Sequence, residues 1–187
     1  SAGMGNLSSA LTAGGDESPV TAKTESWNGA VWSVTNQLNT ARAGLGGGGT
    51  QTTGVVFGGA DPSSTAATEE WNAGISVGAW VTGGTGNTAR GNLAGAGTQT
   101  AALSFGGFGP GTTLQALTEA YNGTAWAEVN DMNTARNNLG GSGTQTAALV
   151  FGGQASPGPT GATELWNGYV WTEVNDLNTV RRFLGGA

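Results

Sequence analysis

The side chains best suited to acid–base chemistry are two pairs of carboxylates in the second half of the chain. Glu128 lies three residues before Asp131, and Glu173 lies three residues before Asp176. Paired carboxylates serve as acid, base or nucleophile in enzymes that cleave glycosidic bonds. The matching places in the first half of the chain hold no such pair. We therefore expect these acids to be solvated turn charges, and only a pair exposed in a cleft would indicate catalysis.

Other kinds of catalytic or metal site find little support in the sequence. The chain contains neither His nor Cys, which excludes Ser-His-Asp and Cys-His nucleophiles, disulfide bonds and the usual structural zinc sites. The Asn-Asp-x-Asn segments at 130–133 and 175–178 lack the glycine and the distal glutamate of a calcium-binding loop. The glycines at 46–49 lack the lysine of a phosphate-binding loop and are predicted to form a closely packed strand. We expect no enzyme activity, no cofactor and no metal.

The elements that must position these residues recur four times in the 187-residue chain. Each copy has a Gly-Gly pair, a Thr-Glu pair, an aromatic residue followed by Asn, a second aromatic residue and an arginine. This spacing divides one domain into repeats 1–49, 50–97, 98–143 and 144–187. The repeated glutamates are Glu25, Glu69, Glu119 and Glu164. The repeated arginines are Arg42, Arg90, Arg136 and Arg181. The second aromatic residues are Trp32, Trp80, Trp126 and Trp171.

The sequence pattern within each repeat predicts short β-strands and no helix. A continuous apolar run, as at 147–151, precedes the Gly-Gly pair and suits a strand buried on both faces. Asn-Gly separates the two aromatic strands in three copies, which indicates a hairpin with a type I′ turn, in which both residues take a positive φ. Four strands in a repeat of about 40–50 residues predict an all-β chain that folds as a β-propeller with four antiparallel strands in each of four repeats.

The order of these residues resembles the kelch repeat over essentially the whole chain. The Gly-Gly pair after an apolar strand, the second Trp and the following Arg all match, and Met132 stands where kelch repeats often carry Met. The chain departs from the pattern in having Trp-Asn where kelch repeats usually have Tyr-Asp. The resemblance implies a kelch-like β-propeller. The sequences of the repeats also resemble those of repeat arrays in structural proteins of tailed phages.

Kelch-like propellers generally have six or seven blades, so four repeats leave three arrangements open. The chain closes alone as a ring of four blades, two chains share a ring of eight, or the repeats belong to a longer array. An open array would expose strand edges and the apolar face of a terminal blade, which favours association.

Residues kept in all four copies are expected to have structural roles. The repeated Arg and Glu are predicted to bond to the backbone or to pair between blades, and the repeated aromatic residues are predicted to form the core between blades. A binding site is expected where the copies differ, chiefly in the loops at one rim of the propeller. The binding candidates are Asp16, Glu17, Asp61, Ile75, Val77, Phe108 and Gln154. Ile75 and Val77 belong to an insertion in the second repeat, and they either fold back on the blade or face a partner.

The charge of the chain limits its partners. The net charge is −6, and four of the six basic residues are the repeated arginines, which argues against binding of nucleic acid or anionic membranes. No apolar segment has the length of a membrane span, and no signal peptide is recognisable. We expect a non-enzymatic binding or display module of an extracellular or phage virion assembly, with a protein or glycan bound at the loop rim. The alternatives are an intracellular adaptor for protein interactions and a lectin-like propeller, which exposed aromatic residues on one rim would favour.

Overall fold

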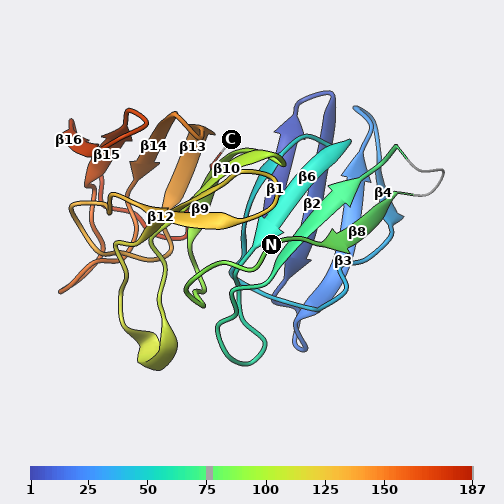
Figure 1. The fold of residues 1–187 in the computed structure, drawn as a ribbon, viewed down its shortest axis with the longest axis horizontal. Helices are drawn as coiled ribbons and strands as arrows, with labels where there is room; N and C mark the ends of the chain where they lie inside the picture. The colour runs from blue at the N-terminus through green and yellow to red at the C-terminus, as the bar shows by residue number, and fades with distance from the viewer. Residues whose placement is uncertain (75–77, 187) are drawn as a thin grey trace.

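Short glycine-rich, apolar and aromatic segments form four antiparallel sheets in the computed structural model, which describes residues 1–74 and 78–186 (Figure 1). The four strands of each sheet lie in sequence order, so each strand pairs with the next one along the chain. Apart from the 3₁₀ turn η1, Pro110–Thr112, the described residues contain no helix. The sheets are arranged as a four-blade β-propeller, which confirms the predicted fold class.

The blades are numbered here in chain order. Blade 1 comprises β1 Ala2–Asn6, β2 Ser9–Gly15, β3 Thr21–Trp27 and β4 Trp32–Thr35. Blade 2 comprises β5 Gly46–Gly49, β6 Thr53–Phe57, β7 Thr68–Asn72 and β8 Ala79–Thr82. Blade 3 comprises β9 Ala94–Thr98, β10 Ala101–Phe105, β11 Thr118–Tyr121 and β12 Trp126–Val129. Blade 4 comprises β13 Gly140–Thr144, β14 Ala147–Phe151, β15 Thr163–Trp166 and β16 Trp171–Val174.

The first strand of each blade is rich in small residues because these inner strands pack side by side. β1 packs on β5, β5 on β9, and β9 on β13. A Cβ added to Gly48 in β5 would approach the carbonyl oxygen of Gly97 in β9 to 2.8 Å, so a side chain there would push the two strands apart. The second strand supplies apolar bulk, as in β10, where Leu103 and Phe105 are fully buried. Glycine therefore brings the blades together, and the second strands fill the space between them.

The outer hairpins form where Asn-Gly predicts them, but their turns are not of type I′. Four residues join β3 to β4, and of the Asn-Gly pair only Gly29 has a positive φ, 92°. The side chain of Asn28 instead accepts hydrogen bonds from two N–H groups later in the turn, at 3.0 and 2.9 Å. The same bonds recur at Asn122 and Asn167. The predicted turn type is therefore wrong, because the asparagine closes the turn with its side chain and not with its backbone.

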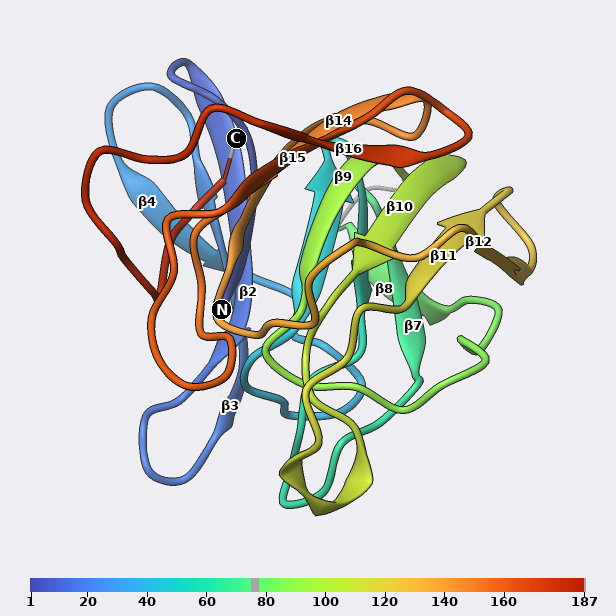
Figure 2. The same cartoon turned by 90° about the vertical axis from the view of Figure 1, so that its left-hand side faces the viewer.

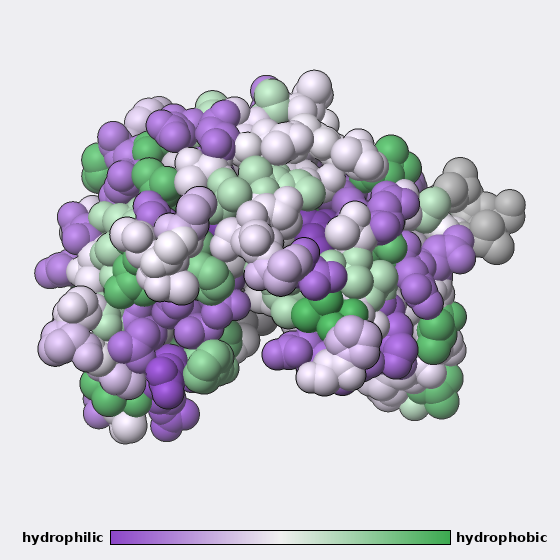
Figure 3. Space-filling view, turned by 90° about the horizontal axis from the view of Figure 1, so that it is seen from below, coloured by the Kyte–Doolittle hydropathy of each residue, from purple (hydrophilic) through white to green (hydrophobic). Residues whose placement is uncertain are grey.

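Consecutive blades pack together, whereas blades 1 and 4 do not pack in the same way. In the described part of the chain, no contact between β13 and β1 matches those that join the inner strands of neighbouring blades. Seen from below, the molecule is hollowed by a notch at its lower edge, between two lobes (Figure 3). The four blades thus make three inter-blade interfaces of one kind, and the outer faces of blades 1 and 4 lie outside them.

Candidate functional site

The loops that join the second strand of each blade to the third all leave the molecule at one end. This end is the lower one in Figure 1, and the loops after β2, β6 and β10 reach the same end in the turned view of Figure 2. We call it the loop rim and define it as residues 16–20, 58–67, 106–117 and 152–162. Apart from the Gly-Gly pairs that open the last three, these four loops differ in sequence, whereas the strands repeat. The rim is therefore the part of the molecule in which the blades differ most from one another.

Two of the predicted binding residues hold their loops against the preceding blade. Phe108 forms an antiparallel bridge with Gly91, and its ring lies against that glycine, so Phe108 is half-buried. Gln154 forms the equivalent bridge with Asn137. The Gln154 side chain also accepts a hydrogen bond from Arg182 at 3.1 Å. These residues belong to the rim and at the same time join neighbouring blades.

The acidic candidates of the rim are exposed and come from two different blades. Asp16 and Glu17 lie in the loop of blade 1, where Glu17 forms an ion pair with Lys23 at 2.9 Å. Asp61 lies in the loop of blade 2 and is also exposed. An exposed ion pair of this kind contributes little to stability. The acids therefore stay available to solvent or to a ligand.

Three of the four repeated arginines, Arg42, Arg90 and Arg136, lie between blades and pair with the glutamate of the next blade. Arg181 is exposed and Glu25 is half-buried, and neither forms an ion pair within the described residues. The Arg90 guanidinium lies 2.7 Å from the Glu119 carboxylate, and both side chains are almost completely buried. Arg90 also donates to the carbonyl oxygens of Gly106 and Leu117 and to the hydroxyl of Ser104, each at 2.8 Å. One side chain from the segment after blade 2 thus ties together three segments of blade 3. The same pairing recurs at 2.7 Å in Arg42–Glu69 and Arg136–Glu164.

Burial makes these ion pairs energetically important. Desolvation lowers the pKa of Arg42, and the charge of Glu69 and its hydrogen bond oppose that shift. Desolvation also lowers the pKa of Arg136, against the carboxylates of Glu164 and Asp176. A guanidinium remains charged in proteins, so each pair is a permanent buried ion pair and not a titrating site. Removing one partner from such a pair leaves an uncompensated charge and costs about 3–5 kcal/mol.

A repeated asparagine strengthens each of these contacts, although it was not among the predicted site residues. The backbone N–H of Asn87 donates to the Glu119 carboxylate at 2.9 Å, and its side-chain amide donates to the carbonyl oxygen of Trp126 at 3.4 Å. Asn39 and Asn133 make the equivalent bonds to the next blade. The residue stands three positions before each repeated arginine, so its recurrence in the sequence was a usable signal.

The second aromatic residue of a blade bonds to the blade before it. The indole N–H groups of Trp80, Trp126 and Trp171 donate to the hydroxyls of Thr24, Thr68 and Thr118 at 3.0, 2.9 and 3.0 Å. Trp126 also packs edge-on against Phe57 of blade 2, with ring centroids 4.9 Å apart. Trp32 stands at the same position of blade 1 but is 50% exposed. The predicted aromatic core is therefore present between neighbouring blades and does not extend to Trp32.

Tyr121, which replaces Trp at one repeated position, links two blades through a polar contact. Its hydroxyl donates to the Glu70 carboxylate at 2.5 Å and accepts a hydrogen bond from the N–H of Gly84 at 3.3 Å. Desolvation raises the pKa of Tyr121, and the bond to Glu70 raises it further. The substitution in the sequence marks this position, but the identity of the partner follows only from the packing of blade 3 on blade 2.

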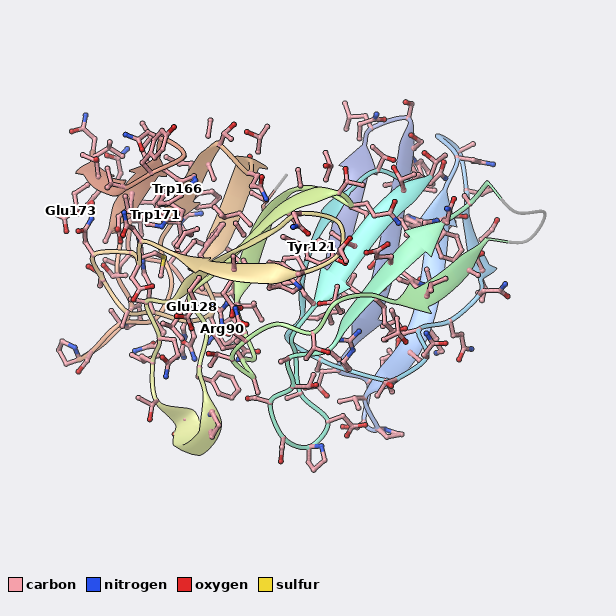
Figure 4. The ribbon with its side chains drawn as sticks, viewed as in Figure 1. Arg90, Tyr121, Glu128, Trp166, Trp171 and Glu173 are labelled. Atoms are coloured by element: carbon pink, nitrogen blue, oxygen red, sulfur yellow. The ribbon has the colours of Figure 1, made fainter. Side chains whose placement is uncertain are left out.

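The two acids of each predicted pair have different surroundings. Asp131 and Asp176 each accept a hydrogen bond at 3.2 Å from the N–H group that opens the third strand of their own blade. Glu128 and Glu173 are exposed on β12 and β16, the outer strands of different blades (Figure 4). The aspartates thus support the sheet, and the glutamates face solvent.

In residues 1–74 and 78–186, no three acidic side chains gather in a way that could hold a metal ion. No helix there is long and apolar enough to cross a membrane. The predicted binding residues Ile75 and Val77 lie outside this part of the chain.

Comparison with known proteins identifies a fold and no family. No protein-family model matches the chain, and no curated protein matches it either. Among solved structures, the chain is similar to that of YjhT, with a TM-score of 0.79 and 10% sequence identity over 95% of the chain. The chain spans 65% of the length of YjhT. At this level of identity the similarity supports the β-propeller fold and carries no ligand or activity across.

Proposed function

We propose that this chain is a non-enzymatic, kelch-like β-propeller that serves as a binding or display module in an extracellular or phage virion assembly. The observation that carries the proposal is a division of roles between the repeated residues and the loop rim. Arg42, Arg90, Arg136 and the asparagines three positions before them bond to the glutamate of the next blade. The buried second Trp residues bond to the preceding blade. The residues that differ between blades are gathered at the loop rim.

The residues that resemble the kelch repeat have physical roles in this division. Gly106, the first glycine of its pair, has a φ of 68°, and a Cβ there would approach the carbonyl oxygen of Arg136 to 2.7 Å. The same glycine offers its own carbonyl oxygen to Arg90 at 2.8 Å. The Gly-Gly pair, the second Trp and the Arg therefore all serve one type of inter-blade contact, which supports the kelch-like assignment.

The composition of the loop rim supports binding of a polar, weakly charged partner. The loops present mainly Ser, Thr, Pro, Gly and amide side chains, with the acids Asp16, Glu17 and Asp61 exposed among them. The loops of blades 2, 3 and 4 each end on a strand whose repeated glutamate forms a buried ion pair. Loops on a rigid scaffold are the usual place for recognition residues. A protein surface or a glycan fits this chemistry better than a polyanion does.

The two alternative functions, a lectin-like propeller and an intracellular adaptor for protein interactions, differ in how well the side chains support them. Of the eight repeated aromatic residues six are buried, and Phe108, which is half-buried, is the single aromatic residue of the loop rim. A lectin-like propeller, which needs exposed aromatic rings, is therefore less favoured. An intracellular adaptor would use the same rim and differs from our proposal in its compartment and partner.

The experiment measures binding of the fluorescently labelled chain to an array of bacterial surface polysaccharides and to intact bacterial cells. The variant Phe108→Ala/Gln154→Ala alters the loop rim, and Leu7→Ser, at an exposed turn away from the rim, is the matched control. We expect the rim variant to lose at least about tenfold in binding while the control keeps it, with both variants folded by circular dichroism. Absence of binding to every target, or binding that the rim variant leaves intact, would contradict the proposal.

A further inference from the structure

Four residues, one from each repeat, are joined by backbone hydrogen bonds that cross from repeat to repeat. They stand two positions after the repeated arginines and are Gly44, Asn92, Asn138 and Phe183. The N–H of Asn92 donates to the carbonyl oxygen of Gly44 at 2.7 Å. In the same way the N–H of Asn138 donates to Asn92 at 2.9 Å, and the N–H of Phe183 donates to Asn138 at 2.8 Å. We call these four residues the inner ladder.

The inner ladder lies where the loop rim meets the inner strands. The strands β5, β9 and β13 begin two residues after the first three members of the ladder. The residue before a ladder residue bridges to the rim, as Gly91 does to Phe108 and Asn137 does to Gln154. The side chains of the ladder are therefore neighbours of the loops in which the blades differ most.

The backbone of the inner ladder favours glycine, but only the first repeat has glycine there. The four φ values are 61°, 52°, 51° and 58° in chain order, all in the left-handed region. This region is disfavoured for residues that carry a Cβ, less so for Asn than for most others. Residues held in such strained conformations cluster at functional sites. Because glycine satisfies this backbone at Gly44, the side chains at the other three places call for a role beyond the fold.

The amide side chains of the ladder keep hydrogen-bonding groups that the fold does not use. Asn92 is half-buried with its side-chain oxygen against Gly44, and its amide forms no hydrogen bond within the described residues. The Asn138 amide donates to the side-chain oxygen of Asn137 at 3.2 Å. Within the same described residues, the Asn138 oxygen and the Asn137 amide N–H groups have no partner. Each of these groups can therefore bond to a ligand.

An exposed aromatic ring and a cation stand next to these amides. Phe183 is 70% exposed, and the guanidinium carbon of Arg182 lies 5.1 Å from the centre of its ring. Arg182 also donates to the Gln154 side chain at 3.1 Å, which joins the ladder to the loop rim. The two positions after the repeated arginine read Ala-Gly, Gly-Asn, Asn-Asn and Arg-Phe in the four repeats. The place thus breaks the symmetry of the repeat, as expected of a binding site.

We propose that the inner ladder is a glycan-binding site in which the amides of Asn92, Asn137 and Asn138 bond to sugar hydroxyls. A hydroxyl donates and accepts hydrogen bonds, and so does an amide. The Phe183 ring contacts the apolar C–H face of a sugar, and it supplies the exposed ring that the loop rim itself lacks. A few amides beside one ring suit a short stretch of glycan, whereas a stable protein interface covers about 800 Å² of each partner. The inference rests on the proposed function and selects the glycan from its two kinds of partner.

The test replaces both asparagines of the ladder by glycine, which suits their backbone. In Asn92→Gly/Asn138→Gly the midpoint of thermal unfolding should stay within about 4 °C of the unchanged chain, because glycine adopts a positive φ readily. Binding to the array of bacterial surface polysaccharides should fall at least about tenfold, since the hydrogen bonds of two amides are lost. The control Leu7→Ser should keep both the midpoint and the binding.

The possible results separate this inference from the proposed function. Polysaccharide binding that survives in Asn92→Gly/Asn138→Gly would overturn the inference, and the proposed function would stand if Phe108→Ala/Gln154→Ala still abolished that binding. Binding to bacterial cells without binding to any polysaccharide would overturn only the inference. Loss of binding with a midpoint lowered by more than about 6 °C would assign the asparagines to the fold and overturn the inference too. Absence of binding to every polysaccharide and to cells would contradict both.

Discussion

The guanidinium of Arg90 lies 2.7 Å from the carboxylate of Glu119, although the two residues stand 29 positions apart and belong to consecutive repeats. Within the described residues, no ion pair joins an arginine to the glutamate of its own repeat. The arginines of the first three repeats pair instead with the glutamates of blades 2, 3 and 4. The blades are joined in one direction along the chain, and each internal joint buries one ion pair.

Arg90→Ala should destabilise the chain strongly, because it leaves Glu119 buried without its partner. We expect the free energy of unfolding, measured by urea denaturation, to fall by about 3–5 kcal/mol. Arg182→Ala is the control, since Arg182 is exposed and its side chain contacts the Gln154 side chain and the Phe183 ring, with no ion pair in the described chain. A fall of less than about 1 kcal/mol for Arg90→Ala would show that the pair contributes little.

The two tryptophans Trp126 and Trp32 should differ in their effect on stability, although they occupy the same place in the repeat. Trp126→Ala removes a ring that is 7% exposed and a bond to the Thr68 hydroxyl, so it should cost about 3–5 kcal/mol. Trp32→Ala alters a ring that is half exposed and should cost about 1 kcal/mol or less. Equal losses in urea denaturation of the two variants would contradict the packing described here.

Gly106→Ala tests the Gly-Gly pair, and Gly111→Ala is its matched control. Both glycines have a positive φ, 68° and 74° respectively, so both variants carry backbone strain of about 1–2 kcal/mol. Only at Gly106 would the added Cβ also meet a neighbour, the carbonyl oxygen of Arg136 at 2.7 Å, whereas the space around Gly111 is open. Gly106→Ala should therefore lower the midpoint of thermal unfolding clearly more than Gly111→Ala, and similar shifts would count against this explanation.

Tyr121 should make the chain less stable at alkaline pH. Burial raises the pKa of Tyr121 above its ordinary value of 10.0, so the unfolded chain loses the phenol proton before the folded chain does. The stability from the neutral phenol is complete below about pH 10 and is lost as the pH rises through the folded pKa. We therefore expect Tyr121→Phe to lose less stability than the unchanged chain between about pH 9 and pH 11, as measured by urea denaturation. This range extends about one pH unit on either side of the ordinary tyrosine pKa. Tyr169→Phe, at an exposed turn, should retain the loss, and identical profiles for all three chains would show that Tyr121 does not cause it.

The sequence was sufficient for the blade and its strands, because the signals for them are local. Asn28 followed by Gly29 predicts a hairpin, and an apolar run before two glycines predicts a buried strand. The predicted turn type was wrong because the turn is closed by hydrogen bonds to the Asn28 side chain. The spacing of residues in the sequence does not show whether the backbone or the side chain of an asparagine closes a turn. The strand of glycines at 46–49 was predicted, but its membership of blade 2 follows from pairing with β6.

The partners of the repeated residues could not be assigned from the sequence. Arg42 has a glutamate in its own repeat, Glu25, and one in the next, Glu69, and only the packing of blades selects the second. The contrast between Trp32 and Trp126 also depends on which blade has a neighbour. The same limit applies to the loop rim, where the bridge from Phe108, a predicted binding residue, to Gly91 before blade 3 follows only from the packing of the blades.

The measurement that tests the central claim most directly is a double-mutant cycle on Arg90 and Glu119, read by urea denaturation. If blades are joined by this ion pair, the losses for Arg90→Ala and Glu119→Ala will not add, and the coupling free energy will be about 2 kcal/mol or more. A coupling below about 0.5 kcal/mol, with the two losses simply adding in the double variant, would mean that the residues act separately and that the blades are held by other contacts.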